Sequence, residues 1–269
     1  MSFWFNRLIE YWSLPRPEQI LDHVRRGHVQ LVQMGNFGPD FYALADDPNV
    51  ARSWAGMPDV GVEENLALAA DLIPRVQAAG ARVVGQLSST LHYGDHETGL
   101  GLFGDAWDRM WTASLLGEAP AHTIADTIAR ETSGEPARRA IEGRPYFSYR
   151  GCISNPLWLD LLKAMVRKGV DLGLDGFNTT HNYEGFCGCT HCVKIIRSYM
   201  RQEFTHVELD DLFATDFDAA ADPRAPSPGA PEPLRQRYLV RLEQAAARRR
   251  KSAFDEVFID YGRSLRPGL

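Results

Sequence analysis

The chain has 269 residues, of which 44% are hydrophobic and 24% charged, with a formal net charge of -6 and a pI near 5.8. This composition is typical of a globular protein with one large domain or two small ones. The acidic balance argues against a nucleic-acid partner, because phosphate binding requires a clustered basic face and the only basic run is 248–251. No apolar stretch reaches the roughly 18 to 20 residues of a membrane span, and the N-terminus has no signal-peptide pattern, so we expect a cytoplasmic protein without membrane contact.

The first part of the chain alternates helical and strand patterns. A helical pattern over 18–27 precedes an apolar run at 29–35, and a second helical pattern over 63–79 precedes an apolar run at 81–89. Short apolar runs bounded by turn residues are typical of buried strands. Helix followed by strand, twice, predicts an α/β fold.

Two further units follow a long excursion. Residues 90–144 are rich in Gly, His, Asp and Trp, and a segment of that length after a strand is typical of a functional loop or a lid. The sequence then predicts a third strand at 145–152, a helix capped by Asn155, and a fourth strand at 175–182. Four helix–strand units are half of what a closed (β/α)8 barrel needs.

The last part of the chain contains no convincing strand. The segment 219–233 is rich in Pro and Ala and is expected to be an exposed or disordered link. From Leu234 onward, apolar residues fall on one stripe of a long helix. We therefore expect three regions: the β/α units at 1–218, the link at 219–233, and a long amphipathic helix at 234–269 that packs on them.

Three of the four cysteines lie close together in the sequence. Cys187, Cys189 and Cys192 directly follow the fourth predicted strand, and Cys152 directly follows the third. Adjacent parallel strands present such ends side by side, so four thiolates can converge on one ion. In a reducing compartment a cysteine cluster favours a metal or redox site over disulfides. We predict a zinc site, and a structural one, because four thiolates leave no open coordination position.

Other interpretations of the cysteines stay open. They can be four unrelated thiols, or one disulfide with two thiols left over, and His191 can replace one cysteine as a ligand. Gly188 is expected to permit a tight turn between the ligands. Four thiolates around one divalent ion carry a net negative charge, which we expect Arg150, Lys194 and Arg197 to compensate.

The order of these motifs resembles a known family. YRGCISNP at 149–156, a helix, a strand, NYEG at 182–185 and then CGCTHC resemble the N-terminal half of glycoside hydrolase family 42 β-galactosidases. The resemblance covers most of 18–265 in the order of elements, but only the cysteine framework is specific. It implies a (β/α)8 TIM barrel of which only the first four or so β/α units are present, a structural zinc ion on the four cysteines, and a carbohydrate ligand.

The resemblance also implies roles for residues near two strand ends. In the family an arginine just before the first zinc cysteine contacts sugar, and Arg150 matches it. An Asn-Glu pair after the fourth strand supplies the general acid/base. This chain has Asn182, Tyr183 and Glu184 there, so Glu184 can serve as the acid/base only if the loop shifts by one residue. Asn182 and Tyr183 are candidate substrate contacts. A retaining glycosidase also needs a second carboxylate about 5 Å away, which the family carries on a late strand.

Three other side chains are candidate sugar contacts. His181, at the end of the fourth strand, is the preferred polar group, because barrel enzymes bind substrate at the carboxyl ends of their strands. His92, just past the second strand, can hydrogen-bond sugar hydroxyls, and Trp107 can stack on a sugar face. The simpler alternatives are a polar exposed loop around His92 and core packing of Trp107 against Trp111.

Three functions fit these patterns. The first is a glycoside hydrolase, or the N-terminal half of one, completed by a C-terminal barrel half or by a second copy of the chain. The second is a non-catalytic carbohydrate-binding relative, and the third is a thiol or redox protein that uses the cysteine cluster. We expect no hydrolysis by the 269-residue chain alone, because a strand that could carry the nucleophile is not evident.

Overall fold

The computed structural model describes residues 4–11, 16–35, 37–47, 61–181 and 185–269. In chain order, the elements of this part of the protein are β1 (Leu8–Tyr11), α1 (Pro17–Gly27), β2 (Leu31–Met34), α2 (Pro39–Leu44), α3 (Val62–Ala78), β3 (Arg82–Ser88), β4 (Leu91–Asp95), β5 (Leu100–Gly101), α4 (Asp105–Met110), the 3₁₀ turn η2 (Ile124–Asp126), β6 (Arg138–Ala140), β7 (Phe147–Arg150), α5 (Pro156–Asp171), β8 (Gly176–Thr180), α6 (Thr190–Glu203), α7 (His206–Phe213), α8 (Glu232–Phe254), the π-helical stretch η3 (Asp255–Tyr261) and α9 (Gly262–Leu265).

The first sheet is parallel and has four strands in the order β1-β2-β3-β8. Each connection between neighbouring strands carries a helix: α1 follows β1, α3 follows β2, and α5 precedes β8. Parallel strands in sequential order, joined by helices, are the arrangement of the first four strands of a (β/α)8 barrel. The predicted fold class, α/β with about four barrel units, is therefore confirmed.

The four parallel strands are not the four that the sequence predicts. The runs at 29–35, 81–89 and 175–182 form β2, β3 and β8, but the predicted third strand at 145–152 forms β7 in a second sheet. Its place in the parallel sheet is taken by β1, whose sequence LIEY is short and only partly buried. Periodicity detects a strand but not its hydrogen-bonding partner, and β1 is too short to give a clear pattern.

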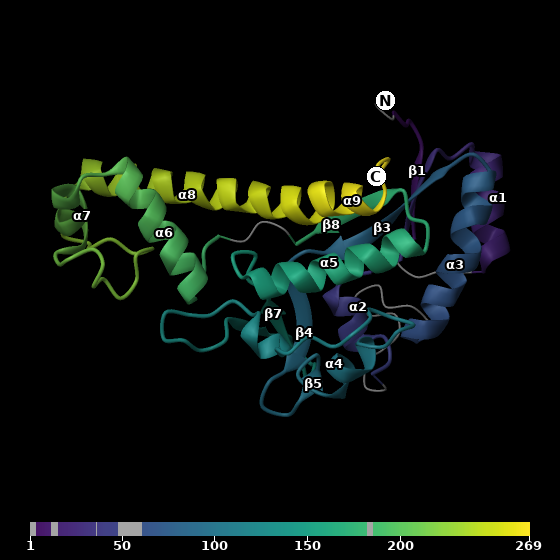
Figure 1. Ribbon diagram of the computed structural model, residues 1–269, viewed down its shortest axis with the longest axis horizontal. Helices are drawn as coiled ribbons and strands as arrows, with labels where there is room; N and C mark the ends of the chain where they lie inside the picture. Colours follow the sequence, from purple (N-terminus) through teal and green to yellow (C-terminus); the bar gives the residue numbers. More distant parts are fainter. Residues whose placement is uncertain (1–3, 12–15, 36, 48–60, 182–184) are drawn as a thin grey trace.

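The long excursion after β3 builds the second sheet. This sheet is antiparallel, in the order β5-β4-β7-β6. The expected long loop at 90–144 thus supplies β4, β5 and β6, which join β7 to form a layer beside the parallel sheet (Figure 1). The excursion is a folded subdomain at the carboxyl ends of the parallel strands.

Helix α5 ties the two sheets together. The side chain of Asn155 caps the helix by accepting a hydrogen bond from the Leu157 backbone N–H at 3.1 Å, and Pro156 occupies the first helical position. Such a cap stabilises a helix by about 1 kcal/mol. The fully buried Trp158 donates its indole N–H to the carbonyl of Ser89 at 2.8 Å, just after β3. The start of α5 is therefore fixed against the end of a parallel strand.

The C-terminal region forms one helical run, from α8 through η3 to α9. It crosses one side of the molecule, with α6 and α7 near its start and α5 near its end (Figure 1). The guanidinium of Arg266 donates to the carbonyls of Gly173 and Leu174 at 3.0 and 2.7 Å, which places the end of the run beside the start of β8. None of the helices in the described part of the chain is both long and apolar enough to cross a membrane.

The segment 219–233 differs from the exposed link that its composition suggests. It contains the buried residues Ala220, Pro223 and Ala230, and the hydroxyl of Tyr238 on α8 donates to the carbonyl of Pro223. Its few apolar groups pack onto the small aromatic cluster around Tyr238, which provides the burial that composition alone does not predict. The segment therefore follows a defined path between α7 and α8.

Candidate functional site

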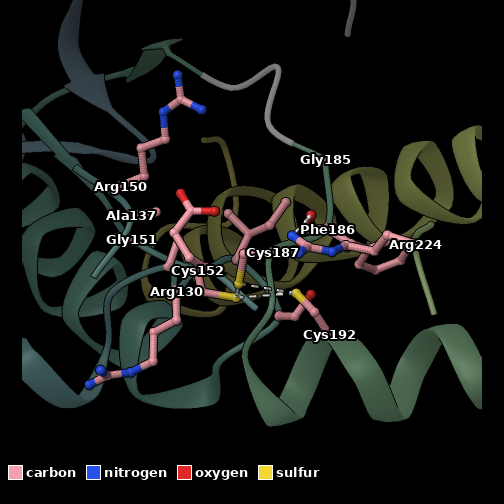
Figure 2. Close-up of a pocket in the computed structure, with 14 residues that line it drawn as sticks. Arg130, Ala137, Arg150, Gly151, Cys152, Gly185, Phe186, Cys187, Cys192 and Arg224 are labelled. Carbon is pink, nitrogen blue, oxygen red and sulfur yellow. Dashed lines mark hydrogen bonds between the residues drawn. The ribbon is translucent and has the colours of Figure 1, made fainter. Parts of the chain in front are cut away.

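The four cysteine side chains converge on one point. Cys152 follows β7, while Cys187, Cys189 and Cys192 lie between β8 and the first turn of α6. The Sγ atom of Cys152 lies 3.5 Å from the Sγ atoms of Cys189 and Cys192. It lies 3.7 Å from that of Cys187, and all four sulfur atoms lie within 4.8 Å of one another. Figure 2 shows the sulfur atoms of Cys152, Cys187 and Cys192 pointing toward each other.

These spacings fit a single tetrahedral ion. Four sulfur atoms bound at about 2.3 Å in tetrahedral geometry lie about 3.8 Å apart. The measured separations of 3.5 to 3.7 Å are close to this value. A multi-iron cluster would hold its cysteine sulfurs further apart. The predicted four-cysteine set is thus confirmed as a group that can hold one metal ion.

A bound cation would change the protonation of these four thiols. The pKa of Cys187 lies well below its ordinary value, because hydrogen bonds with the neighbouring thiols, first that of Cys152, favour its thiolate form. The pKa of Cys152 is raised, chiefly by its hydrogen bond with Cys187 and also by burial, because both favour the neutral thiol. A divalent ion allows all four to bind as thiolates.

Cys152 reaches the cluster through the antiparallel sheet and not as the end of a parallel strand. The backbone N–H of Cys152 donates to the carbonyl of Thr127 at 3.0 Å, and that of Gly151 donates to the carbonyl of Thr90 at 2.7 Å. The expectation that β7 and β8 are adjacent parallel strands is therefore wrong, although the cysteines do meet. Both strands lead into the cysteine cluster, and α5 joins them in the chain.

Gly188 has a different role from the one expected. Its φ is not positive, so it does not provide a left-handed turn. Instead its N–H donates to the carbonyl of Arg130 at 2.7 Å, and a Cβ atom here would lie only 2.5 Å from the carbonyl oxygen of Glu131. Glycine is required because two backbones approach closely, which lets the loop 185–189 lie against the segment that follows η2.

The cation beside the four cysteines is Arg224, a residue that no pattern in the sequence indicated. It lines a small cavity of ≈ 140 Å³ together with Phe186 and Cys187, and it lies beside Phe186 in Figure 2. Its pKa is raised, chiefly by a hydrogen bond to Asp222 and also by the charge of Cys187. Arg224 belongs to the segment 219–233, more than thirty residues from the cluster, so spacing offered no signal for it.

The three cations expected near the cluster differ in their surroundings. Lys194 is exposed, and Arg197 donates to the carbonyl of Ala220 at 2.9 Å. Arg150 lines the small cavity, but its side chain extends away from the sulfur atoms (Figure 2). Arg150 also lines a second, larger cleft.

This second cleft, of ≈ 440 Å³, lies at the carboxyl ends of β3 and β8. Its floor is one face of the antiparallel sheet. The residues that line it are Thr90, Leu91, Tyr93, Arg139, Ala140, Ile141, Glu142, Ser148, Arg150 and His181. In (β/α)8 enzymes the substrate binds at the carboxyl ends of the strands, and this cleft occupies that position.

Strand alternation decides which side chains reach the cleft. Tyr93 of β4 pairs with Ser148 of β7, and both point to the cleft. The next pair in the ladder, His92 with Tyr149, points to the opposite face, which is the core. In the sequence, residues 147–150 alternate an aromatic residue with a polar one. This alternation could have indicated that Ser148 and Arg150 face the same cleft.

His92 is consequently not a sugar contact. The residue is fully buried, with its ring 5.5 Å from that of Tyr149 and 5.9 Å from that of Trp158. Burial lowers the pKa of His92 to about 3, so the imidazole is neutral at physiological pH. The expectation that it hydrogen-bonds substrate is corrected: its strand neighbour Tyr93 takes the position in the cleft.

Trp107 lies on α4, away from the cleft. It is 7% exposed, and its ring meets that of Trp111 edge to face at 5.4 Å. It borders a separate depression together with His96 and Phe103. The interpretation of Trp107 as a packing residue therefore holds, and stacking on a sugar in the cleft does not.

His181 and Arg150 do come together, as lining residues of the same cleft. His181 has a left-handed backbone, with φ of 52°, which is uncommon for a residue other than glycine. Its Nδ1 lies 3.3 Å from the Ser88 hydroxyl, and its carbonyl accepts hydrogen bonds from the hydroxyls of Ser89 and Thr90. These contacts fix the chain just after β8. Asn182, Tyr183 and Glu184 follow immediately and lie outside the described residues.

No protein-family model matches the chain, and no curated protein is significantly similar to it in sequence. Among solved structures, it is similar to a cycloisomaltooligosaccharide glucanotransferase from Paenibacillus sp. (10% identity, TM-score 0.41, 64% of this chain and 23% of that chain). It is also similar to an α-galactosidase from Thermus thermophilus (17% identity, TM-score 0.40, 66% and 31%). A hypothetical protein from Ruminiclostridium thermocellum gives 9% identity and a TM-score of 0.41 (74% and 93%). The chain thus spans less than a third of the length of the two named enzymes, and all three similarities are distant.

Proposed function

We propose that the chain is part of a carbohydrate-binding β/α barrel related to glycoside hydrolases, and that the sugar binds in the cleft at the ends of β3 and β8. One observation carries this proposal: Tyr93, Ser148, Arg150 and His181 line a single cleft at the carboxyl ends of parallel strands. Their hydroxyl, guanidinium and imidazole groups can hydrogen-bond sugar hydroxyls, and the ring of Tyr93 offers an apolar surface. Arg150 and His181 are the proposed sugar contacts that sequence also suggests.

We propose zinc for the four-cysteine set and a structural role for it. Tetrahedral coordination by four sulfurs is typical of zinc, and it leaves no position for a substrate. The ion would link Cys152 to Cys187. Cys152 lies two residues after Arg150, and Cys187 lies three residues before the start of α6. Both chain segments that lead to the cleft are thereby anchored at one point, so metal binding supports the shape of the cleft.

For catalysis we propose Glu184 as the general acid/base, with Asn182 and Tyr183 as substrate contacts. These assignments, and the β-galactosidase activity, follow from the likeness of the cysteine framework and of NYEG to family 42, with the one-residue displacement of the glutamate. Among the described residues that line the cleft, Glu142 is the one carboxylate. A glycosidase needs two, so the nucleophile is proposed to come from strands beyond β8.

The parallel sheet supports the proposal that further strands complete the barrel. Within the described residues, β1 and β8 each pair on one side only. On the face that would line a barrel, Gln33 hydrogen-bonds both Glu10 and Asn178. Beside the free edge of β1, Leu8 is 46% exposed. Open edges with apolar side chains favour association, either with a C-terminal barrel half or with a second copy of the chain.

The decisive test of the binding site is titration calorimetry with mono- and oligosaccharides, including galactose. We expect His181→Ala and Tyr93→Ala each to weaken binding about tenfold or more, because each removes a hydrogen bond or contact area in the cleft. His206→Ala, which changes an exposed histidine on α7, is the matched control and should bind like the wild type. Binding that is unaffected by both cleft variants would contradict the site.

Hydrolysis of aryl β-galactosides tests the proposed catalytic role of Glu184. If a completed barrel hydrolyses them, Glu184→Gln should abolish turnover while sugar binding persists. Sugar binding without any hydrolysis would instead support the non-catalytic relative. A redox role for the partly exposed Cys187 requires a metal-free cluster, so a stoichiometric zinc ion that resists chelators would exclude it.

A further inference from the structure

The cleft contains two arginines on neighbouring strands. Arg139 of β6 lies directly opposite Ser148 of β7, and Arg150 lies two residues further along β7. Side chains two residues apart on a strand point to the same face, so Arg139 and Arg150 are diagonal neighbours on the cleft side of the sheet. Diagonal neighbours of this kind are about 7 to 8 Å apart, within reach of each other for long side chains.

The strand neighbour of Arg139 provides an internal comparison. Arg138 points to the opposite face, where its guanidinium lies 2.7 Å from Glu97 and 3.7 Å from Asp95. Arg139, by contrast, has no ion-pair partner among the described residues and is exposed. Of the described residues that line the cleft, only Glu142 is acidic, against two arginines and His181. The described lining of the cleft is thus richer in basic than in acidic side chains, in a chain whose formal net charge is -6.

Resting on the proposed function, we propose that the sugar bound in this cleft is anionic, and that Arg139 and Arg150 together bind its carboxylate or phosphate group. A guanidinium matches either group through paired hydrogen bonds. Tyr93 and His181, which line the same cleft, then contact the sugar ring.

The test compares matched sugars by titration calorimetry at low and at physiological salt. Galacturonate and glucuronate are measured against galactose and glucose, and glucose 6-phosphate against glucose. We expect at least one anionic sugar to bind tenfold or more tightly than its neutral counterpart, with a preference that weakens as salt rises. The uronate and phosphate arms show which anion the cleft accepts.

Variants locate the anion site. Arg139→Gln should remove about a tenfold preference for the anionic sugar while leaving the affinity for the neutral sugar unchanged. Arg139→Lys keeps the charge but not the paired hydrogen bonds, so it should retain only part of the preference. Arg25→Gln, which changes an exposed arginine on α1, is the control and should alter neither affinity. Circular dichroism of each variant checks that the fold is intact.

The outcomes separate this inference from the function on which it rests. Equal affinity for neutral and anionic sugars, or a preference that survives in both Arg139→Gln and Arg150→Gln, would overturn the inference and leave the carbohydrate site standing. If neither class of sugar binds, the proposed function fails and the inference fails with it.

Discussion

The Sγ atoms of Cys152 and Cys192 lie 3.5 Å apart, although 40 residues separate the two cysteines in the chain. Between them run the whole of α5 and β8. A metal ion shared by these sulfurs therefore closes a long loop and joins the end of the antiparallel sheet to the first turn of α6. Because Arg150 lies two residues before Cys152, the contact also bears on the cleft.

The first prediction concerns metal content. Purified protein should contain one zinc ion per chain by mass spectrometry of the metal, and Cys152→Ser should lose it. Loss of a structural metal should lower the free energy of unfolding by more than about 4 kcal/mol, measured by denaturant titration. His191→Ala should keep the ion, because the sulfur atoms of the four cysteines already complete the set. A Cys152→Ser protein that retains stoichiometric zinc would contradict this assignment.

The second prediction uses two glycines of the same loop. Gly188→Ala should destabilise the protein by about 1 to 3 kcal/mol and weaken metal binding, because the new Cβ would lie 2.5 Å from the Glu131 carbonyl oxygen. Gly185→Ala is the matched control, since a Cβ there meets nothing within 4 Å. Thermal unfolding and competition with a chromogenic chelator measure the two effects. Equal behaviour of the two variants would refute the close approach at Gly188.

The third prediction is a pH dependence that arises from His92. The pKa of His92 falls from its ordinary 6.5 to about 3 on burial, so between these values the unfolded chain binds a proton that the folded chain does not. Above pH 6.5, His92 is neutral in both states and does not oppose folding. As the pH falls from 6.5 toward 3, protonation of His92 in the unfolded chain lowers the free energy of unfolding. At pH 5 the loss amounts to about 2 kcal/mol.

His92→Phe should remove this dependence. Its stability relative to wild type, from urea unfolding, should improve by about 2 kcal/mol when the pH is lowered from 7.5 to 5. The comparison between two pH values cancels any packing cost of the larger ring. His206→Phe, on the exposed surface of α7, should show no such change. A constant difference at both pH values would mean that His92 is not buried in the neutral form.

The fourth prediction concerns the open sheet. The 269-residue chain, studied alone, should self-associate and show a mass above 30.1 kDa by light scattering, because no strand of the described residues pairs with the outer edge of β1, and exposed apolar side chains lie there. Leu8→Lys should shift the protein toward the monomer. Val207→Lys, at a position that is 69% exposed on α7, should not. A wild-type protein that is monomeric at high concentration would contradict an association through this edge.

Elements whose pattern is local were predictable. The helices α1, α3 and α5 and the strands β2, β3 and β8 lie close to the ranges that apolar spacing indicates. The sequence did not indicate the strands β1, β4, β5 and β6, because each is stabilised by its partner strand and not by a pattern of its own. For the same reason the sequence predicted β7 as a strand but assigned it to the wrong sheet. Its partner strands, β4 and β6, come from the segment 90–144.

The sequence by itself identified the four cysteines that could hold one metal ion, because three of them lie close together and the fourth follows a neighbouring predicted strand. Only the tertiary structure decided which polar side chains reach the cleft. Tyr93 faces it while His92 is buried, because the core covers one face of the antiparallel sheet and so assigns alternate residues to opposite sides. Arg224 and Arg139 likewise acquire their positions from packing between segments far apart in the chain, and no local pattern encodes such an encounter.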